Sequence, residues 1–214
     1  MMDGILIPIK RLSLAKARLA HVVPSGIRRR LGLAMLADVL RATDEWTPRL
    51  LVTDDPDAEA VGLAFGCVLV ADPGTGLNPS VEAGTEAGIA LGVTSLLVLA
   101  SDLPLVTALE VASLFECEAE VAVAGSSDGG TNALLRRPPG VIEPAFGPSS
   151  ARLHETSARQ QGRSFQLVRS PGLQFDIDEP GDLEQLATAP EDRESVKVAR
   201  EAIRSPVDEG REPL

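Results

Sequence analysis

The sequence alternates short apolar runs with longer segments in which apolar residues recur every three or four positions. A short apolar run bounded by turn residues favours a buried strand, whereas the wider spacing favours a helix with one apolar face. Strand and helix alternate through about four such units in the first part of the chain. This order predicts an α/β protein whose mostly parallel sheet is covered by helices on both faces.

The alternation also gives the approximate position of each element. Strands are expected at residues 5–9, 50–53, 68–70, 95–99, 120–124, 133–136, 165–169 and 173–175. Helices are expected at residues 27–42, 58–65, 77–91, 106–115, 149–161 and 179–187, with Thr107 as an N-cap. We therefore expect one domain over residues 1–187, followed by a charged tail over residues 188–214 that is partly disordered and includes a helical stretch.

Composition narrows the class of partner. Hydrophobic residues make up 44% of the 214 residues, which is enough for one continuous core, whereas aromatic residues make up only 3%. Few aromatic residues and a net charge of −11 disfavour nucleic acid or an anionic membrane as partner. Two cysteines without a C-x-x-C pattern argue against a zinc site. Together with the lack of a signal peptide or a bilayer-spanning stretch, they predict a cytoplasmic protein.

The first predicted strand is followed by a basic segment. Lys10, Arg11, Lys16 and Arg18 fall within nine residues, just before a predicted helix. Cations and backbone N–H groups at the carboxyl end of a strand are typical of phosphate binding. A solvated basic loop is the alternative, and the residues alone favour neither. The segment lacks the spacing of a P-loop or of a dinucleotide-binding loop.

Three aspartates are candidate metal ligands. Asp102 directly follows the most hydrophobic strand, and Asp176 and Asp178 stand two residues apart in a segment expected to be extended. Alternate residues of an extended segment point the same way, and two adjacent carboxylates repel unless a cation lies between them. Oxygen ligands of this kind suit Mg²⁺. Capping of a turn or of the following helix is the alternative for each.

Glycine-rich segments precede several predicted helices and strands. Gly76 allows close approach of a ligand to the backbone, and Asn78 is a candidate to contact a base or ribose, although turn and cap roles explain both residues as well. The segments 129–132 and 146–150 combine glycine with hydroxyl groups, which indicates anion binding or ordinary capping. His21 and His154 lack a paired nucleophile, so we predict that neither is catalytic and that His154 lies on a helix surface.

Taken together, these segments resemble a known family. The ordered segments are IPIK (7–10), AKARL (15–19), AMLADVL (34–40), ADPGTGLN (71–78), SDLPL (101–105), GGTNALL (129–135), PAFGPSS (144–150) and DIDEPGDL (176–183). In this order they resemble the guanylyltransferases of coenzyme F-420 biosynthesis, which act on phosphoenolpyruvate or 2-phospho-L-lactate. The resemblance covers residues 4–186 approximately. Molybdenum-cofactor and sugar nucleotidyltransferases are expected to begin with a glycine-rich loop instead of IPIK, which argues against them.

The resemblance implies a fold, ligands and site residues. The fold would be a single-domain, Rossmann-like nucleotidyltransferase of the GT-A type with a mixed, mostly parallel sheet. The ligands would be GTP, Mg²⁺ and a small phosphorylated acid, and the enzyme would form dimers. The implied metal ligands are Asp102, Asp176 and Asp178, and the implied acid-binding residues are Thr131, Gly147 and Ser150. The implied nucleotide-binding residues are Lys10, Lys16, Arg18, Gly76 and Asn78, of which the three cations would also be catalytic.

The expected reaction is transfer of GMP. A phosphate oxygen of the acceptor would attack the α-phosphorus of GTP, with diphosphate as the leaving group. Phosphoenolpyruvate is the preferred acceptor, and 2-phospho-L-lactate and 3-phosphoglycerate remain open. Another nucleotidyltransferase, of the sugar-nucleotide or molybdenum-cofactor type, and a non-catalytic nucleotide-binding module are the rival hypotheses.

Overall fold

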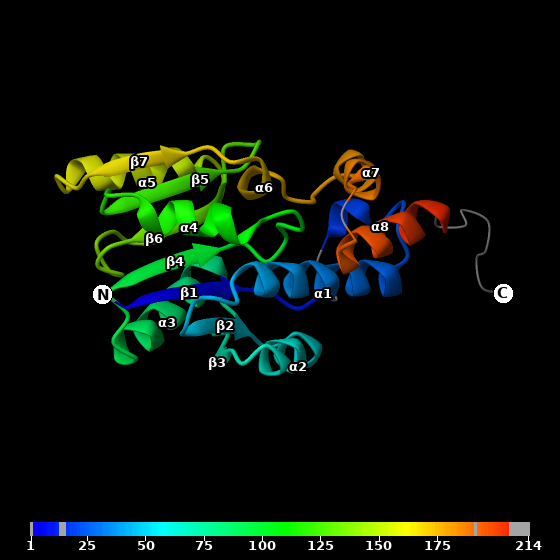
Figure 1. The fold of residues 1–214 in the computed structure, drawn as a ribbon, viewed down its shortest axis with the longest axis horizontal. Helices are drawn as coiled ribbons and strands as arrows, with labels where there is room; N and C mark the ends of the chain where they lie inside the picture. The colour runs from blue at the N-terminus through cyan, green and yellow to red at the C-terminus, as the bar shows by residue number, and fades with distance from the viewer. Residues whose placement is uncertain (1, 13–15, 191, 206–214) are drawn as a thin grey trace.

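A computed structural model describes residues 2–12, 16–190 and 192–205. Its strands form one sheet in the order β3-β2-β1-β4-β6-β5-β7 (Figure 1). The strands are β1 Asp3–Pro8, β2 Arg49–Thr53, β3 Val68–Ala71, β4 Ser95–Leu99, β5 Val121–Gly125, β6 Thr131–Arg136 and β7 Phe165–Val168. The expected strands in these regions are thus confirmed, with shifts of one or two residues at their ends.

Strand β6 is the exception to the parallel arrangement. It runs antiparallel to both of its neighbours, β4 and β5, whereas every other neighbouring pair in the sheet is parallel. The first residues of β6 therefore lie at the sheet edge where β1 and β4 end. The mixed, mostly parallel sheet expected from the resemblance is confirmed.

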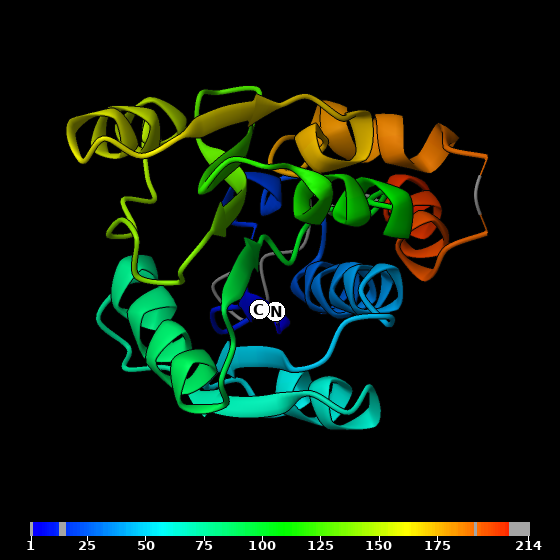
Figure 2. The same cartoon turned by 60° about the vertical axis from the view of Figure 1, so that its left-hand side comes forward.

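Helices cover both faces of the sheet (Figure 2). One face carries α1 Ser25–Ala42, α2 Pro56–Ala64 and α4 Ala108–Glu116, and the other carries α3 Leu77–Ala90 and α5 Ser150–Gln160. Both faces need cover because successive residues of a strand point to opposite sides. In β1, Ile5 and Ile7 pack in the core of the first face, and Leu6 packs in the core of the second. As expected, Thr107 caps α4, within a capping box closed by Glu110.

The prediction of a strand at residues 173–175 is wrong. The chain forms the short helix α6, Pro171–Gln174, instead. Pro171 suits the first position of a helix, and the carboxylate of Glu110 accepts hydrogen bonds from the Ser170 hydroxyl and, at 2.7 Å, from the Gly172 amide. The start of α6 is thus held by a side chain of α4, which is distant in sequence and outside any local pattern.

The C-terminal segment is part of the folded core. Helices α7 Pro180–Thr188 and α8 Glu194–Arg204 pack together with α1 (Figure 1). The expected helical stretch is present, but Val196 and Ala199 of α8 are fully buried in a core that also includes Leu31 and Leu186. A charged tail is therefore not an adequate description of residues 194–204. The remainder of the predicted tail, residues 206–214, lies outside the described residues.

Across the described ranges 2–12, 16–190 and 192–205, no helix is long and apolar enough to cross a membrane. Both cysteines, Cys67 and Cys117, are buried and unpaired.

Candidate functional site

A cavity of about 400 Å³ lies at the carboxyl ends of β1 and β4. This is the edge where open α/β sheets bind their ligands. The cavity is lined by Pro8, Ile9, Lys10, Leu12, Lys16, Arg18, Gly32, Met35, Ser101, Asp102 and Asp178. It therefore brings together the basic segment and two of the three predicted metal ligands, although these residues are far apart in sequence.

Lys16 lies at the centre of this arrangement. Its Nζ is 2.5 Å from Asp102 Oδ2 and 3.1 Å from Asp178 Oδ1, and its side chain is only 8% exposed. Burial lowers the pKa of Lys16, but the charges of Asp102 and Asp178 outweigh it, so the pKa is raised and the ammonium stays charged. Lys16 also adopts a left-handed backbone conformation, with φ of 55°, which is uncommon for a residue other than glycine.

The third aspartate is placed beside β6. Asn132 Nδ2 donates to Asp176 Oδ1 at 3.4 Å, and Ile177, the next residue, is fully buried. Burial and the charge of Asp102 raise the pKa of Asp176, and the hydrogen bond from Asn132 offsets only part of this rise. On balance, its surroundings disfavour the ionised form of Asp176, which a nearby cation would favour.

The donor set fits a divalent cation that is shared with a ligand. Within the part of the chain that the structure describes, no group of three His, Cys, Asp or Glu side chains is close enough together to hold a metal ion. Asp102 and Asp178 nevertheless share one cation, the ammonium of Lys16. Mg²⁺ commonly takes one or two protein carboxylates and completes its shell with phosphate oxygens and water.

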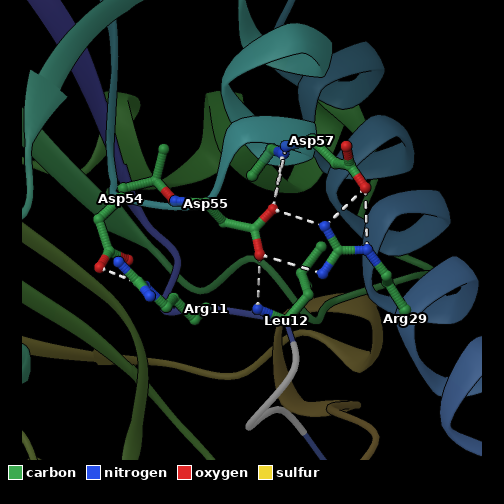
Figure 3. A network of polar contacts seen from close by, with 8 residues as sticks. Arg11, Leu12, Arg29, Asp54, Asp55 and Asp57 are labelled. Carbon is green, nitrogen blue, oxygen red and sulfur yellow. Dashed lines mark hydrogen bonds and ion pairs between the residues drawn. The ribbon is translucent and has the colours of Figure 1, made fainter.

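The start of the basic segment is fixed to α2. Asp55 Oδ2 accepts a hydrogen bond from the Leu12 amide at 3.0 Å, and Asp55 Oδ1 accepts from the amides of Asp57 and Ala58 at the first turn of α2 (Figure 3). Arg29 of α1 reaches the same carboxylate and that of Asp57. Although burial raises the pKa of Asp55, these amide hydrogen bonds lower it overall. One buried carboxylate thus anchors the loop that carries Lys10.

The other cations of the segment are more exposed. Lys10 lines the cavity, and Arg18 Nη1 lies 3.9 Å from Asp178 and 3.8 Å from Glu179. Arg11 points to a different partner, because its Nε donates to Asp54 Oδ2 at 2.6 Å (Figure 3). The predicted set of Lys10, Lys16 and Arg18 is therefore brought to one cavity.

A smaller cavity of about 240 Å³ adjoins Lys10. It is lined by Lys10, Arg11, Asp54, Asp72, Gly74 and Gly76. Asp72 Oδ1 accepts from the Ser80 hydroxyl and the Gly74 amide, each at 2.8 Å. Gly76 has φ of 133°, a conformation that side chains rarely adopt. Lys10 lines both cavities, so the two adjoin at this side chain.

Asn78, in the first turn of α3, joins that helix to the loop before Gly147. Its Oδ1 accepts from the Phe146 amide at 2.7 Å, and its Nδ2 donates to the Phe146 carbonyl at 3.2 Å. The predicted contact of Asn78 with a nucleoside is untested, and its amide is committed to the loop before Gly147. That loop is held a second time by Arg136, which donates to the Ile142 carbonyl.

The predicted acid-binding residues meet at the start of α5. Ser150 Oγ donates to Thr131 Oγ1 at 2.9 Å, and Gly147, with φ of 137°, precedes Ser150 by a short turn. The helix carries no acidic residue in its first turn, so its dipole favours an anion here. Ser150 is fully buried, whereas Thr131 is partly exposed.

The prediction that His154 lies on a helix surface is wrong. The ring is fully buried, with Nε2 accepting from the Ala145 amide at 2.9 Å and Nδ1 lying 3.2 Å from Thr131 Oγ1. The polar neighbours of His154 in sequence suggested exposure, but His154 lies three residues after Ala151 and four after Ser150, on the face of the helix that turns inward. His21, by contrast, is exposed.

Sequence reasoning also missed two supporting residues. Asn132 belongs to the segment 129–132. The pattern of glycine and hydroxyl groups in this segment indicates the hydroxyl of Thr131 and not the side-chain amide of Asn132. Asp55 follows a predicted strand and precedes Pro56, which is a recognisable N-cap signal, but its bond to Leu12 is not visible in the sequence.

Comparison with known proteins gives one consistent result. Residues 3–209 match the family described as "Guanylyl transferase CofC like". A phosphoenolpyruvate guanylyltransferase of Sphaerobacter thermophilus is 38% identical over 85% of this chain and 91% of its own. One of Chloroflexus aggregans is 37% identical over 88% of this chain and 98% of its own.

Solved structures with this fold are more distant in sequence. A Desulfovibrio desulfuricans structure, described as a nucleotide-diphospho-sugar transferase, has a TM-score of 0.80 at 17% identity, covering 95% of this chain and 98% of its own. A Leptospira borgpetersenii cytidylyltransferase has a TM-score of 0.57 at 12% identity, covering 95% and 94%. They show the nucleotidyltransferase fold alone. The match over residues 3–209, with relatives above 35% identity, shows that the chain belongs to the CofC-like guanylyltransferase family of enzymes.

Proposed function

We propose that this protein transfers GMP from GTP to phosphoenolpyruvate and releases diphosphate. The observation that carries the proposal is the nearly buried ammonium of Lys16 between Asp102 and Asp178, in a cavity that Lys10 and Arg18 also line. Fixed positive charge beside carboxylates suits a polyphosphate that arrives with a divalent cation. Both relatives described above bear the name phosphoenolpyruvate guanylyltransferase.

In this reaction a phosphate oxygen of phosphoenolpyruvate attacks the α-phosphorus of GTP. The bond between that phosphorus and the oxygen bridging to the β-phosphate breaks, and diphosphate leaves with the electron pair. The nucleophile is already anionic at neutral pH, so no general base is needed. Lys10, Lys16 and Arg18 act by position and charge, neutralising the phosphates as the bond breaks. Mg²⁺ would be held by one or two of the carboxylates of Asp102, Asp176 and Asp178 together with phosphate oxygens, to which it would supply further positive charge.

We assign the nucleoside to the smaller cavity beside Lys10. Guanine presents acceptors at O6 and N7 and a donor amino group at N2. The cavity offers the carboxylates of Asp54 and Asp72 as acceptors and the side chains of Lys10 and Arg11 as donors. Gly76 leaves room for the ribose, and Asn78 fixes the adjoining loop.

We assign the phosphorylated acid to the start of α5. Thr131, Gly147 and Ser150 lie there, and the dipole of α5 favours an anion. The antiparallel direction of β6 supports this assignment, because it delivers Thr131 to the same edge as Asp102.

The test is release of diphosphate from each nucleoside triphosphate in combination with each of three acids. The acids are phosphoenolpyruvate, 2-phospho-L-lactate and 3-phosphoglycerate, each with and without Mg²⁺, and mass spectrometry identifies the product. We expect turnover with GTP and phosphoenolpyruvate that depends on Mg²⁺. ITP, which lacks the N2 amino group, should be used less efficiently than GTP, and this difference should shrink in Asp72→Asn.

Absence of turnover with GTP and all three acids would overturn the proposal. Preference for another acid would keep the guanylyltransferase reaction and replace the acceptor, and preference for CTP would favour a different nucleotidyltransferase.

A further inference from the structure

A short network of hydrogen bonds lies behind the proposed acid-binding site. It joins three elements: His154 of α5, Thr131 at the start of β6, and the Ala145 amide in the loop before α5. The Ser150 hydroxyl donates to the same Thr131 oxygen. The side chains of His154 and Ser150 are fully buried, so Thr131 is the side chain of this network that a ligand can reach.

The protonation of the histidine follows from its partners. A backbone amide can only donate, so His154 Nε2 must be an acceptor without a proton. Burial, together with the nearby charge of Arg136, lowers the pKa of His154 to about 4, which keeps the ring neutral near pH 7. A neutral imidazole has one acceptor and one donor nitrogen. His154 Nδ1 therefore carries the proton and donates to Thr131 Oγ1.

The direction of the Thr131 hydroxyl follows in turn. Its oxygen accepts one hydrogen bond from His154 Nδ1 and one from Ser150 Oγ. These two bonds occupy both lone pairs of the oxygen. Its own hydrogen must then point away from both, toward the partly exposed side. The hydroxyl of Thr131 is thus a donor at the site and has no free capacity to accept.

The backbone of β6 brings Thr131 to this position. The pairing register shifts between Ala124 and Gly125, which leaves one extra residue on β6. Regular alternation from Leu134, which packs in the core beneath α5, would turn Thr131 away from α5. The bulge instead allows Thr131 to contact α5 while its neighbour Asn132 contacts Asp176.

We propose that His154 is a positioning residue that makes the Thr131 hydroxyl an obligate hydrogen-bond donor to an anionic oxygen of the phosphorylated acid. The inference rests on the proposed function. A fixed donor favours an ionised phosphate or carboxylate over a neutral hydroxyl group, because an acceptor-only partner matches it. His154 also holds Ala145, and so orders the loop that leads to Gly147.

Two conservative substitutions separate these contacts. The amide nitrogen of asparagine falls near the position of Nδ1, so His154→Asn keeps a donor to Thr131 and loses the acceptor for Ala145. Glutamine reaches the position of Nε2, so His154→Gln keeps the acceptor and loses the donor. We expect His154→Gln to raise the KM for phosphoenolpyruvate about ten- to hundredfold, with little change in the KM for GTP. His154→Asn should stay within about threefold of the natural enzyme.

Thr131 provides the matched pair. Thr131→Ser keeps the hydroxyl and should retain a low KM for phosphoenolpyruvate, whereas Thr131→Val removes it. Because His154 acts through Thr131, adding His154→Gln to Thr131→Val should cause no further loss. Equal effects of His154→Asn and His154→Gln, or equal changes in both KM values, would show a merely structural role.

A measurement that needs no turnover completes the test. Nitrogen-15 NMR of the histidine rings reports which nitrogen of His154 is protonated, and we expect Nδ1–H. Calorimetric binding of phosphoenolpyruvate to the full chain and to the two His154 variants gives the affinity directly. An Nε2–H tautomer, or equal affinity of all three proteins, overturns the inference. If the natural enzyme has the expected tautomer and binds phosphoenolpyruvate but does not turn over, the proposed function fails and the assignment of His154 stands.

Discussion

At the scale of single residues, Lys16 carries most of the proposed chemistry. It reaches two carboxylates from a left-handed backbone position. We expect Lys16→Met to lower kcat for GTP and phosphoenolpyruvate about hundredfold or more, because it removes a fixed charge from the phosphate site. Lys197→Met, which removes an exposed lysine of α8, is the control with the same change of charge. Similar rates for the two variants in a diphosphate-release assay would contradict this role.

His154 gives a prediction about stability and pH. Its pKa is about 4 in the folded protein and near 6.5 in an unfolded chain. The unfolded chain therefore takes up a proton first, and the contribution of His154 to stability is complete above pH 6.5 and is lost as the pH falls toward 4. Between pH 7 and 4.5 this loss is on the order of 2–3 kcal/mol. The free energy of unfolding, measured in urea, should fall more steeply over this pH range for the natural protein than for His154→Asn, which lacks the titrating group.

Part of this geometry could be predicted from the sequence. Asp102 and the basic segment each follow a predicted strand, at the sheet edge where ligands bind, and Lys16 contacts Asp102. The assignment of metal, phosphate and acid to individual residues stays a prediction. His154 could not be placed from its neighbours, because its burial depends on a loop and a bulged strand that come together only in the folded chain.

At the scale of elements, Asp55 links a loop to a helix. It caps α2 and holds the Leu12 amide with the same buried carboxylate. We expect Asp55→Ala to lower the free energy of unfolding by about 2–3 kcal/mol, since it leaves several amides without a partner, and to raise the KM for GTP. Asp57→Ala breaks an exposed ion pair with Arg29 and should cost less than about 1 kcal/mol. The free energy of unfolding in denaturant and the KM for GTP should be measured for both variants and compared. Equal losses of stability would argue against Asp55 as the anchor.

Most elements could be predicted because local signals agree with the fold. The strands at 50–53 and 95–99 consist mainly of continuous apolar runs, and Thr107 marks the start of α4. Helix α6 could not be predicted, because a short apolar run is compatible with a strand or a helix. The contact that decides is the hydrogen bond from the Gly172 amide to the carboxylate of Glu110.

At the scale of the whole molecule, α8 closes the core formed with α1 and α7. Asp38 of α1, itself buried, accepts from the amide and hydroxyl of Ser195, and Arg193 donates to the carbonyls of Pro104 and Val106, just after Asp102. The helix therefore supports both the core and the loop that follows a proposed metal ligand.

A chain ending at Thr188 should consequently lose cooperative folding. Each large apolar side chain uncovered by removing α8 costs about 1.5–3 kcal/mol, against a total stability of about 5–15 kcal/mol. We expect a fall in Tm of more than about 10 °C, or an insoluble protein, measured by circular dichroism on heating. A chain ending at Ser205 keeps every contact described above and is the control. Equal Tm values would show that α8 is dispensable.

Assembly into dimers and a cytoplasmic location stay predictions.

The reversed direction of β6 has a consequence for engineering. The residues assigned to GTP follow strands β1 to β3, whereas those assigned to the acid lie within the continuous stretch from Gly125 to His154, which includes β6 and the start of α5. The two specificities are thus encoded in separate pieces of chain. Transplanting residues 125–154 from a relative with another acceptor should exchange the acid while leaving the nucleotide unchanged.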